Sequence, residues 1–315
     1  MPAFFNGIFA HKPSPNIVPT DGHFPRGKTK TFNDYLSIGP MCRYAEDLMP
    51  MLKAMAGKEK AHNVQLEKPV DISSLKFYVV DDDALPAMAS SVNFELKNAQ
   101  EKLCHYLTER FQVKIQKISP KRFRYSPIIW AASVLSPEDE NFICEMVEHK
   151  SCRVNPFIEI PRYLAGYSKY HYITLVVVIL ECIKRLIPNV LSNFNNMGKM
   201  LMREMEELLG DDGVLLYPSH PNTALSHHRP FLAPLNFSYT AIFNILHMPV
   251  TQCPLGLDRE GLPLGIQIAA AENNDRLTLA VAQTLSKGFG DWNSWEPGSK
   301  TMVEKCSTFT KKKTI

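Results

Sequence analysis

The residue types that could carry acyl-transfer chemistry gather around position 220. Ser219 and His220 are adjacent, the pair His227-His228 follows them, and Asp211-Asp212 precedes them. Serine, histidine and aspartate can act as a nucleophile, its general base and the group that orients the base. Adjacent residues rarely form the bond from nucleophile to base, however, and no G-x-S-x-G turn surrounds Ser219. We therefore interpret Ser219 and His220 as ordinary loop residues.

The same histidines are candidate metal ligands. His220, His227 and His228 lie in a proline-rich loop that offers no helical face, and no H-E-x-x-H arrangement is present. The seven cysteines contain no C-x-x-C pair, which argues against a structural zinc site. Their odd number argues against a disulfide framework and is typical of a reducing compartment. We predict no metal site and no other cofactor.

Composition limits the classes of function that the chain can have. Its 315 residues are 45% hydrophobic and 21% charged, so it can bury a sizeable core as one large α/β domain or two of ordinary size. The formal net charge is only +3, and no basic patch alternates with aromatic residues along the chain. A nucleic-acid partner is therefore not expected.

The spacing of apolar residues predicts the elements that must position these side chains. Strand, helix and strand follow one another between residues 75 and 118, which predicts a parallel crossover. Prolines and glycines interrupt residues 1–40, which are expected to form loops. Pro50 should kink the first helix, and Asp275 should cap the last. Helices are expected over 43–56, 91–111, 191–209, 238–246 and 275–288, and strands over 75–80, 113–118, 214–217, 250–253 and 264–269.

One apolar run could contact a membrane. Residues 173–180 form the most apolar window of the chain, and charged residues and Pro188 follow it. A membrane-spanning helix needs about 18 or more apolar residues, so this run is too short to span a bilayer. We interpret it as a buried strand or helix. The alternative is an interfacial segment, with tyrosines at one edge and Lys184 and Arg185 at the other.

Four segments, in order along the chain, carry a family resemblance. Residues 7–14 (G-I-F-A-H-K-P-S) are similar to G-x-x-G-x-K-P-[ST], with Ala10 in place of the second glycine, and residues 39–48 match G-P-[ML]-x-R-x-x-x-D-[LA]. Residues 212–221 match D-x-[LV]-L-x-P-[TS]-x-P, and residues 236–267 are similar to N-x-[TS]-G-x-P-[AV]-x-x-x-P-x-G and the strand after it. Together these motifs resemble the amidase signature family. Within it they are most similar to the fatty-acid amide hydrolases, membrane-associated enzymes that cleave long-chain fatty-acid amides.

The resemblance implies a fold and a division of the chain. The fold would be the C-terminal portion of the amidase α/β/α architecture, a mixed sheet with helices on both faces. Residues 1–290 would form a partial amidase domain, and residues 291–315 a flexible basic tail. The family uses a nucleophilic serine, a second serine and a neutral lysine. In the family pattern all three precede the position of Met1, so the resemblance assigns no catalytic residue to this chain.

Ser14 is the one serine within the matched motifs that invites a catalytic interpretation. It lies between Pro13 and Pro15 in the K-P-S element, which is a structural turn in the family. No neighbouring lysine is expected to be buried, so no base is at hand. We therefore predict a structural role for Ser14.

The resemblance also implies an acyl-binding channel. Its wall would include Tyr239, Thr240, Phe243 and Met248, and its ligand would be a lipid amide substrate or the fatty acid produced from it. An apolar channel with few polar groups suits such a ligand. The alternative for each of these residues is plain core packing of a short helix.

Two functional hypotheses follow. The first is a fatty-acid amide hydrolase family member that is inactive alone, and the second is a non-catalytic lipid-binding or interaction protein derived from an amidase. We expect contact with a membrane surface and formation of a homodimer. Because no secretory signal opens the chain, we expect it on the cytoplasmic side. Residues 311–315 fit the dilysine pattern of endoplasmic-reticulum retrieval, and the alternative for them is a solvated basic tail.

Overall fold

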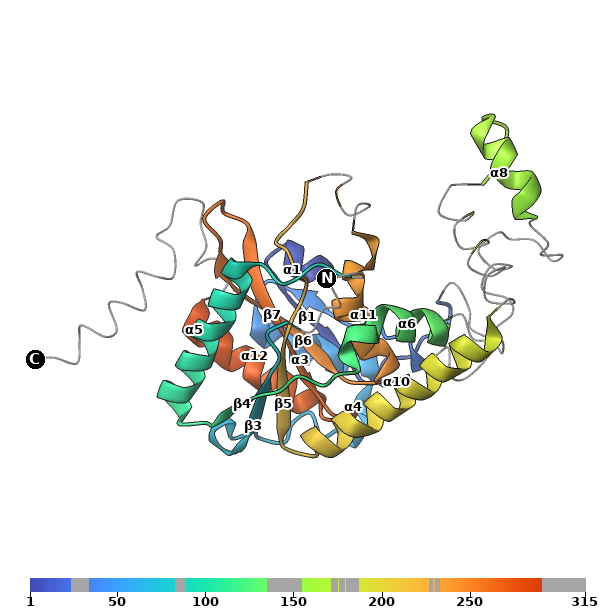
Figure 1. Cartoon of the computed structure of the whole chain (residues 1–315). Helices are drawn as coiled ribbons and strands as arrows, with labels where there is room; N and C mark the ends of the chain where they lie inside the picture. The colour runs from blue at the N-terminus through green and yellow to red at the C-terminus, as the bar shows by residue number, and fades with distance from the viewer. Residues whose placement is uncertain are drawn as a thin grey trace, which may run out of the picture.

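The centre of the molecule is one mixed seven-stranded sheet (Figure 1). The computed structural model describes residues 1–23, 34–82, 89–134, 155–170, 187–226 and 233–290, and the single positions 175, 179 and 229. The strand order is β2-β1-β6-β7-β5-β3-β4. The strands are β1 (Phe9–Lys12), β2 (Met41–Cys42), β3 (Lys76–Val79), β4 (Ile115–Lys117), β5 (Gly213–Pro218), β6 (Val250–Leu257) and β7 (Pro263–Ala270).

The sheet combines a parallel and an antiparallel part. β3 pairs in parallel with both β4 and β5, whereas β5–β7, β7–β6, β6–β1 and β1–β2 are antiparallel pairs. The parallel crossover between residues 75 and 118 is thereby confirmed, with α5 (Phe94–Phe111) as its helix. The mixed sheet predicted from the family resemblance is confirmed as well.

Successive residues of β5 feed the two cores on opposite faces of the sheet. Val214 and Leu216 belong to one buried cluster, and Leu215 and Tyr217 to the other, because side chains alternate across a strand. All six residues of β5 are buried. A strand buried on both faces reads as a continuous apolar run, which is why residues 214–217 are recognisable in the sequence.

Helices cover both faces (Figure 1). One core lies under α3 (Ala45–Ala56), α12 (Asp275–Phe289) and most of the apolar face of α5. The other lies under α6 (Ser126–Val134), α10 (Pro188–Leu209) and α11 (Ser238–Ile245). Shorter helical segments are α1 (Pro2–Phe5), α4 (Lys58–Asn63), α8 (Pro156–Leu164), η1 (Ile72–Ser74), η2 (Phe123–Tyr125) and η4 (Pro234–Phe237). Helix α8 stands away from the sheet in Figure 1.

Three expectations about elements need correction. Residues 1–40 were expected to form loops, but they contain helix α1 and strand β1. Asp275 does not cap α12, because the N-cap residue is Asn274 and the Asp275 carboxylate bonds elsewhere. Helix α10 begins at Pro188, three residues before the expected start, because proline is tolerated in the first turn of a helix.

Two predicted segments lie outside the described residues. They are the basic tail over 291–315 and the apolar run over 173–180 apart from residues 175 and 179. None of the helices within the described ranges is both long and apolar enough to cross a membrane.

Gly39 of the G-P-M-C-R motif lies where β1 meets the segment that leads into β2. The amide of His11 donates to the carbonyl of Pro40 at 3.0 Å. A Cβ atom on Gly39 would lie 1.8 Å from the carbonyl oxygen of His11, and this backbone atom cannot rotate away. The motif glycine is therefore required by close backbone approach.

We predict that Gly39→Ala destabilises the chain by more than about 2 kcal/mol, because β1 and the segment that leads into β2 must separate to admit the methyl group. The measurement is urea unfolding followed by circular dichroism. Met41→Ala is the matched control, since Met41 is 55% exposed in the same segment and its truncation should change stability by less than about 0.5 kcal/mol. Equal effects of the two substitutions would contradict this account.

Candidate functional site

The structure separates Ser219 from His220 chemically. Ser219 is buried, and its hydroxyl donates to Oε1 of Gln252 on β6. The His220 ring stands edge-on to Phe5 with centroids 5.0 Å apart, and its Nδ1 lies 2.7 Å from the carbonyl oxygen of Asn222. Burial lowers the pKa of His220, with a partial opposing effect from Asn222. The two side chains are not hydrogen-bonded to each other, as expected for adjacent loop residues.

The third member of the Ser-His-Asp hypothesis lies at the other end of a strand. Asp212 precedes β5 and pairs with Lys76 at 3.1 Å, whereas Ser219 and His220 follow β5. A six-residue strand is about 20 Å long, so Asp212 cannot orient His220. His227 and His228 lie outside the described residues. Within the described ranges, His, Cys, Asp and Glu do not form any group of three that could hold a metal ion.

A buried polar network joins β1 to α12. Ser14 donates to Asp275 twice, from its amide to Oδ1 at 2.9 Å and from its hydroxyl to Oδ2 at 2.6 Å. Nε2 of His11 lies 3.0 Å from Oδ1 of the same carboxylate, and Nδ1 of His11 lies 2.8 Å from Oγ1 of Thr251. Thr251 in turn donates to Thr278 at 2.8 Å. Asp275 thus stands between the serine and the histidine, so this is not a nucleophile–base arrangement.

Two ionisable groups beside this network have shifted pKa values. Burial would raise the pKa of Asp275, but the hydrogen bonds and charge of His11 and the two bonds from Ser14 outweigh it, so the pKa is lowered. Burial lowers the pKa of Lys12 to about 8, against the raising effect of Asp275 and Glu272. Lys12 is half-buried two residues before Ser14, which corrects the expectation that no buried lysine neighbours this serine.

Lys12 nevertheless does not act on Ser14 in this structure. Its amine donates to the carbonyl of Pro13 at 3.1 Å, while the Ser14 hydroxyl donates to Asp275 and accepts from the amide of Asn273 at 2.8 Å. Ser14 is 1% exposed, so a substrate cannot reach it. The structural role predicted for Ser14 agrees with these contacts.

The four predicted channel residues lie in or beside the core under α11. Tyr239, Phe243 and Met248 are fully buried in that cluster, and half-buried Thr240 donates from its hydroxyl to the carbonyl of Phe237 at 2.9 Å. The Tyr217 ring lies 5.9 Å from that of Tyr239 and 5.2 Å from that of Phe243. This burial is what core packing requires. Contact with an acyl chain stays a prediction.

Sequence reasoning missed the polar side chains that tie this cluster to the sheet. Gln267 of β7 donates to the carbonyls of Pro218 at 2.9 Å and Tyr239 at 3.1 Å, and it is 5% exposed. Gln252 of β6 is equally buried and accepts from Ser219. A glutamine within each of two mainly apolar strands was the available signal, because a buried amide requires partners.

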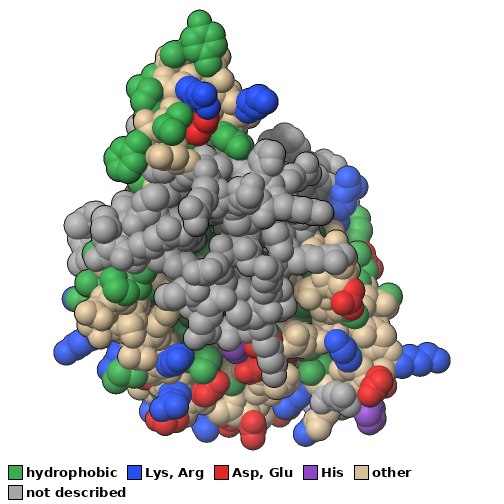
Figure 2. All heavy atoms as spheres, turned by 90° about the vertical axis from the view of Figure 1, so that its right-hand side faces the viewer, with side chains coloured by type: hydrophobic (Ala, Val, Ile, Leu, Met, Phe, Trp, Pro, Cys, Tyr) green, Lys and Arg blue, Asp and Glu red, His purple; other side chains and the backbone are tan. Residues whose placement is uncertain are grey.

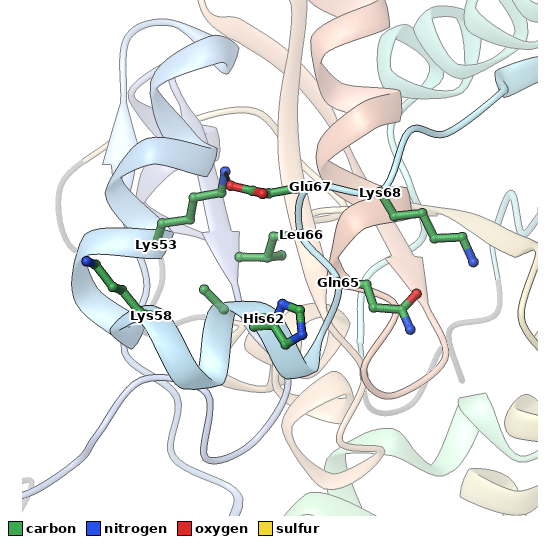
Figure 3. A pocket seen from close by; sticks show the side chains of 8 residues that line it. Lys53, Lys58, His62, Gln65, Leu66, Glu67 and Lys68 are labelled. Atoms are coloured by element: carbon green, nitrogen blue, oxygen red, sulfur yellow. Dashed lines mark hydrogen bonds and ion pairs between the residues drawn. The ribbon is translucent and has the colours of Figure 1, made fainter.

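A hollow of about 960 Å³ lies between the end of α3, helix α4 and the turn that follows it (Figure 3). Its lining carries three lysines and one glutamate, and Glu67 pairs with Lys53 at 2.9 Å. Lys58 and Lys68 extend to opposite sides in Figure 3, so their amines do not converge on one point. Among the described residues no serine, cysteine or threonine lines the hollow, so it offers no hydroxyl or thiol nucleophile. The lining residues are Lys53, Lys58, Ala61, His62, Gln65, Leu66, Glu67 and Lys68.

The chain is similar in sequence to known proteins over nearly its whole length. Human (Homo sapiens) fatty-acid amide hydrolase 2 is 42% identical over 299 residues, which are 93% of this chain and 55% of that protein. Fatty-acid amide hydrolase 2-A of Danio rerio is 41% identical over 96% of this chain and 56% of its own length. The chain belongs to the amidase signature family. The chain spans about half the length of these curated relatives.

Solved structures agree with the amidase signature fold. A bacterial aryl acylamidase described as one of the amidase signature enzymes superposes with a TM-score of 0.62 at 15% identity. The superposition covers 93% of this chain and 60% of the acylamidase. No protein-family model matches the chain. The α/β/α portion expected from the resemblance is thus confirmed.

We predict that Asp275→Asn lowers stability at pH 7 by about 2–3 kcal/mol, because the charge that accepts from Ser14 and His11 is lost. The folded-state pKa of Asp275 is lowered, so its stabilisation is complete above the ordinary aspartate pKa of about 3.9 and is lost as pH falls through the lower folded value. The stability difference between wild type and variant should therefore narrow from pH 5 to pH 3. Urea titrations at each pH measure it.

Asp211→Asn serves as the control for this experiment, because Asp211 is exposed and should change stability by less than about 0.5 kcal/mol at every pH. A stability difference for Asp275→Asn that stays constant down to pH 3 would show that the carboxylate charge is not what holds β1 to α12.

Proposed function

We propose that this chain serves the hydrolysis of long-chain fatty-acid amides by providing the acyl-binding part of the fold, and that it does not hydrolyse amides alone. The observation that carries the proposal is the 42% identity with human fatty-acid amide hydrolase 2 over 93% of the chain. The matched residues make up nearly the whole chain, so the identity is not confined to one short motif. The ligand would be a lipid amide or the fatty acid derived from it.

The aromatic cluster under α11 supports an apolar ligand. Phe123, Tyr217 and Phe243 are fully buried, with Phe123 5.4 Å from Tyr217 and 6.3 Å from Phe243 between ring centroids. An acyl chain is recognised by apolar and aromatic walls with few polar groups. Tyr239, Thr240, Phe243 and Met248 are the residues of this wall that we assign to the ligand.

The hydrogen bonds of the described serines support the absence of amide hydrolysis by this chain. A serine nucleophile needs a base within about 3 Å. Within the described residues, no serine hydroxyl is hydrogen-bonded to a lysine amine, and each buried serine with an assigned bond donates elsewhere. Lys12, whose pKa is lowered to about 8, donates to a backbone carbonyl.

The same observation favours a second candidate function, a non-catalytic lipid-binding protein derived from an amidase. Both candidates require the acyl-binding wall. They differ in whether the chain works together with a serine–lysine centre that a second polypeptide provides. Binding of a fatty acid without hydrolysis is common to both. Restoration of hydrolysis by an added N-terminal half of human fatty-acid amide hydrolase 2 would favour the first.

We predict that the purified 315-residue chain releases no oleic acid from oleamide above the buffer background, because no described serine has a base. A fluorophosphonate probe should label no single residue stoichiometrically. The measurement is mass spectrometry of the product and of the labelled protein, with Ser14→Ala and Ser219→Ala as matched variants. Turnover that one of these substitutions abolishes would contradict the proposal.

Helix α8 supports contact with a membrane surface, which is the partner we propose besides the lipid ligand. It presents large apolar side chains to solvent, with Phe157 86%, Ile158 51% and Leu164 80% exposed. Figure 2 shows hydrophobic side chains, in green, on the part of the molecule that rises above the body. Tyr167, just after the helix, is 83% exposed. An amphipathic helix with aromatic residues suits the boundary between headgroups and acyl chains.

The charges of α8 are compatible with an anionic lipid surface. Glu159 is its acidic residue, and it pairs with Arg162 at 2.9 Å and accepts from Ser168 at 3.1 Å. Because Glu159 is neutralised within the helix, it opposes lipid approach weakly. Lys169 is exposed after the helix and adds a positive charge.

We predict that the chain binds vesicles of phosphatidylcholine and phosphatidylserine. The double variant Phe157→Ser with Leu164→Ser should lower the partition coefficient at least about tenfold, because burial of each apolar side chain in the membrane contributes about 1–2 kcal/mol to binding. Co-sedimentation measures it. Met200→Ser is the matched control, because Met200 is 53% exposed on α10. Unchanged binding by the double variant would contradict a role of α8. A dimer that the double variant dissociates would show instead that a second copy covers the helix.

A further inference from the structure

Hydrogen bonds join the two ends of the segment between β3 and α5. Asp82 lies just after β3, and Ser90 and Val92 lie just before α5. The Asp82 carboxylate accepts from the amide of Val92 at 3.1 Å and from Nζ of Lys97 at 2.9 Å. The two ends of the segment are therefore fastened to each other.

Side chains around the start of α11 fasten the same segment from the opposite side. Oδ1 of Asn236 accepts from the amide of Ser90 at 2.8 Å, and Nδ2 of Asn236 donates to the hydroxyl of Ser90 at 3.1 Å. The Tyr239 hydroxyl donates to the carbonyl of Ser90 at 2.9 Å and lies 3.4 Å from Oδ1 of Asp82. Every polar group of Ser90 thus bonds to Asn236 or Tyr239. We call Asp82, Ser90, Asn236 and Tyr239 the clasp.

The clasp also connects to the end of β5. Gln267 donates to the carbonyls of Tyr239 and Pro218, and the amide of Asn93 donates to the carbonyl of Pro221 at 2.7 Å. Hydrogen bonds therefore link residues 90–93, the first turn of α11 and the end of β5. The buried aromatic cluster of Tyr217, Tyr239 and Phe243 lies where these three elements meet.

We propose that Tyr239 is a positioning residue of the acyl-binding site. Its hydroxyl, together with Asn236, fixes the Ser90–Val92 segment against α11, and this bond sets the shape of the aromatic wall. This inference rests on the proposed function and deepens it. Tyr239 was predicted to line the channel, and the clasp gives its phenol a different role, because a hydroxyl that is bonded to a carbonyl acts through that backbone.

The chemistry of the phenol explains why this position uses tyrosine. Tyr239 is 2% exposed, so its hydroxyl must find a partner inside the protein. Phenylalanine would retain the ring contacts with Tyr217 and would leave the carbonyl of Ser90 without this donor. The Tyr239→Phe substitution therefore tests the hydroxyl separately from the packing of the ring.

The first measurement is hydrogen exchange at the amides of Ser90, Val92 and Asn93, each of which donates to a partner described above. In Tyr239→Phe we expect these three amides to exchange about tenfold faster, because a loss of about 1.4 kcal/mol of local stability corresponds to a tenfold change. Exchange of the amides of β6 should stay unchanged. Thr284→Val is the matched control, because the Thr284 hydroxyl donates to the carbonyl of Ala280 at 2.9 Å within α12 and its loss should leave these amides unchanged.

The second measurement is binding of the fluorescent fatty acid cis-parinaric acid, with a decanoic acid competitor to report chain-length preference. We expect Tyr239→Phe to weaken binding of the long probe about tenfold and of decanoic acid by less, so that the preference narrows. Asn236→Ala should weaken binding of the long probe in the same way, because it removes both bonds between Asn236 and Ser90.

The outcomes separate the clasp from the proposed function. If the wild-type chain does not bind cis-parinaric acid, the proposed function fails, and the exchange measurement still tests the clasp. If the wild type binds and Tyr239→Phe exchanges and binds like the wild type, the clasp is wrong. If exchange rises in Tyr239→Phe while affinity and chain-length preference stay constant, the clasp is only structural and the positioning role is overturned.

Discussion

The arrangement of this molecule depends on the hydrogen bonds that the Asp275 carboxylate accepts. This carboxylate lies on the first turn of the last helix and accepts hydrogen bonds from residues near the start of the chain, across 261 positions of sequence. A carboxylate this deeply buried is tolerated only when donors surround it. Ser14 and His11 provide them, and so the same bonds that satisfy the charge also join the first strand to the last helix.

That constraint organises the sheet. Strand β1 lies between β2 and β6, and β6 and β7 form the antiparallel hairpin that connects β1 to the parallel part through β5. The two cores on either side are filled by alternating residues of the same strands, so displacing either helical layer would expose the apolar face of the sheet that it covers. The candidate site residues around α11 belong to one of these cores. Their geometry is therefore set by the whole sheet rather than by a loop.

The long periodic elements could be predicted from the sequence because their signal is local. Helices over 94–111 and 188–209 and strand β5 carry enough apolar residues at one spacing to be recognised. Helix α1 and strand β1 are only four residues each, and their pairing partners lie far along the chain. Asp275 shows the same limit, since its position at the start of a helix suggests a local cap, whereas its true partners are distant.

The candidate site shows a similar division. The sequence grouped Tyr239, Phe243 and Met248, which lie in one core, while their contact with an acyl chain stays a prediction. It also correctly separated Ser219 from His220, because adjacency is visible in the sequence. It did not reveal that the Tyr239 hydroxyl bonds to Ser90, or that Gln252 and Gln267 satisfy buried partners. Such bonds join segments whose approach depends on the completed fold, and no short motif encodes them.

The pairing of β1 with β6 has a consequence for biosynthesis. His11 and Thr251, which face each other in this pair, are 240 residues apart. At about 5–20 residues per second, a ribosome needs roughly 10–50 seconds between translating the two. Throughout that interval β1, which includes fully buried Phe9, can pair with the two-residue strand β2, but its other edge lacks β6. One edge of β1 therefore stays unpaired on the nascent chain until β6 has been translated.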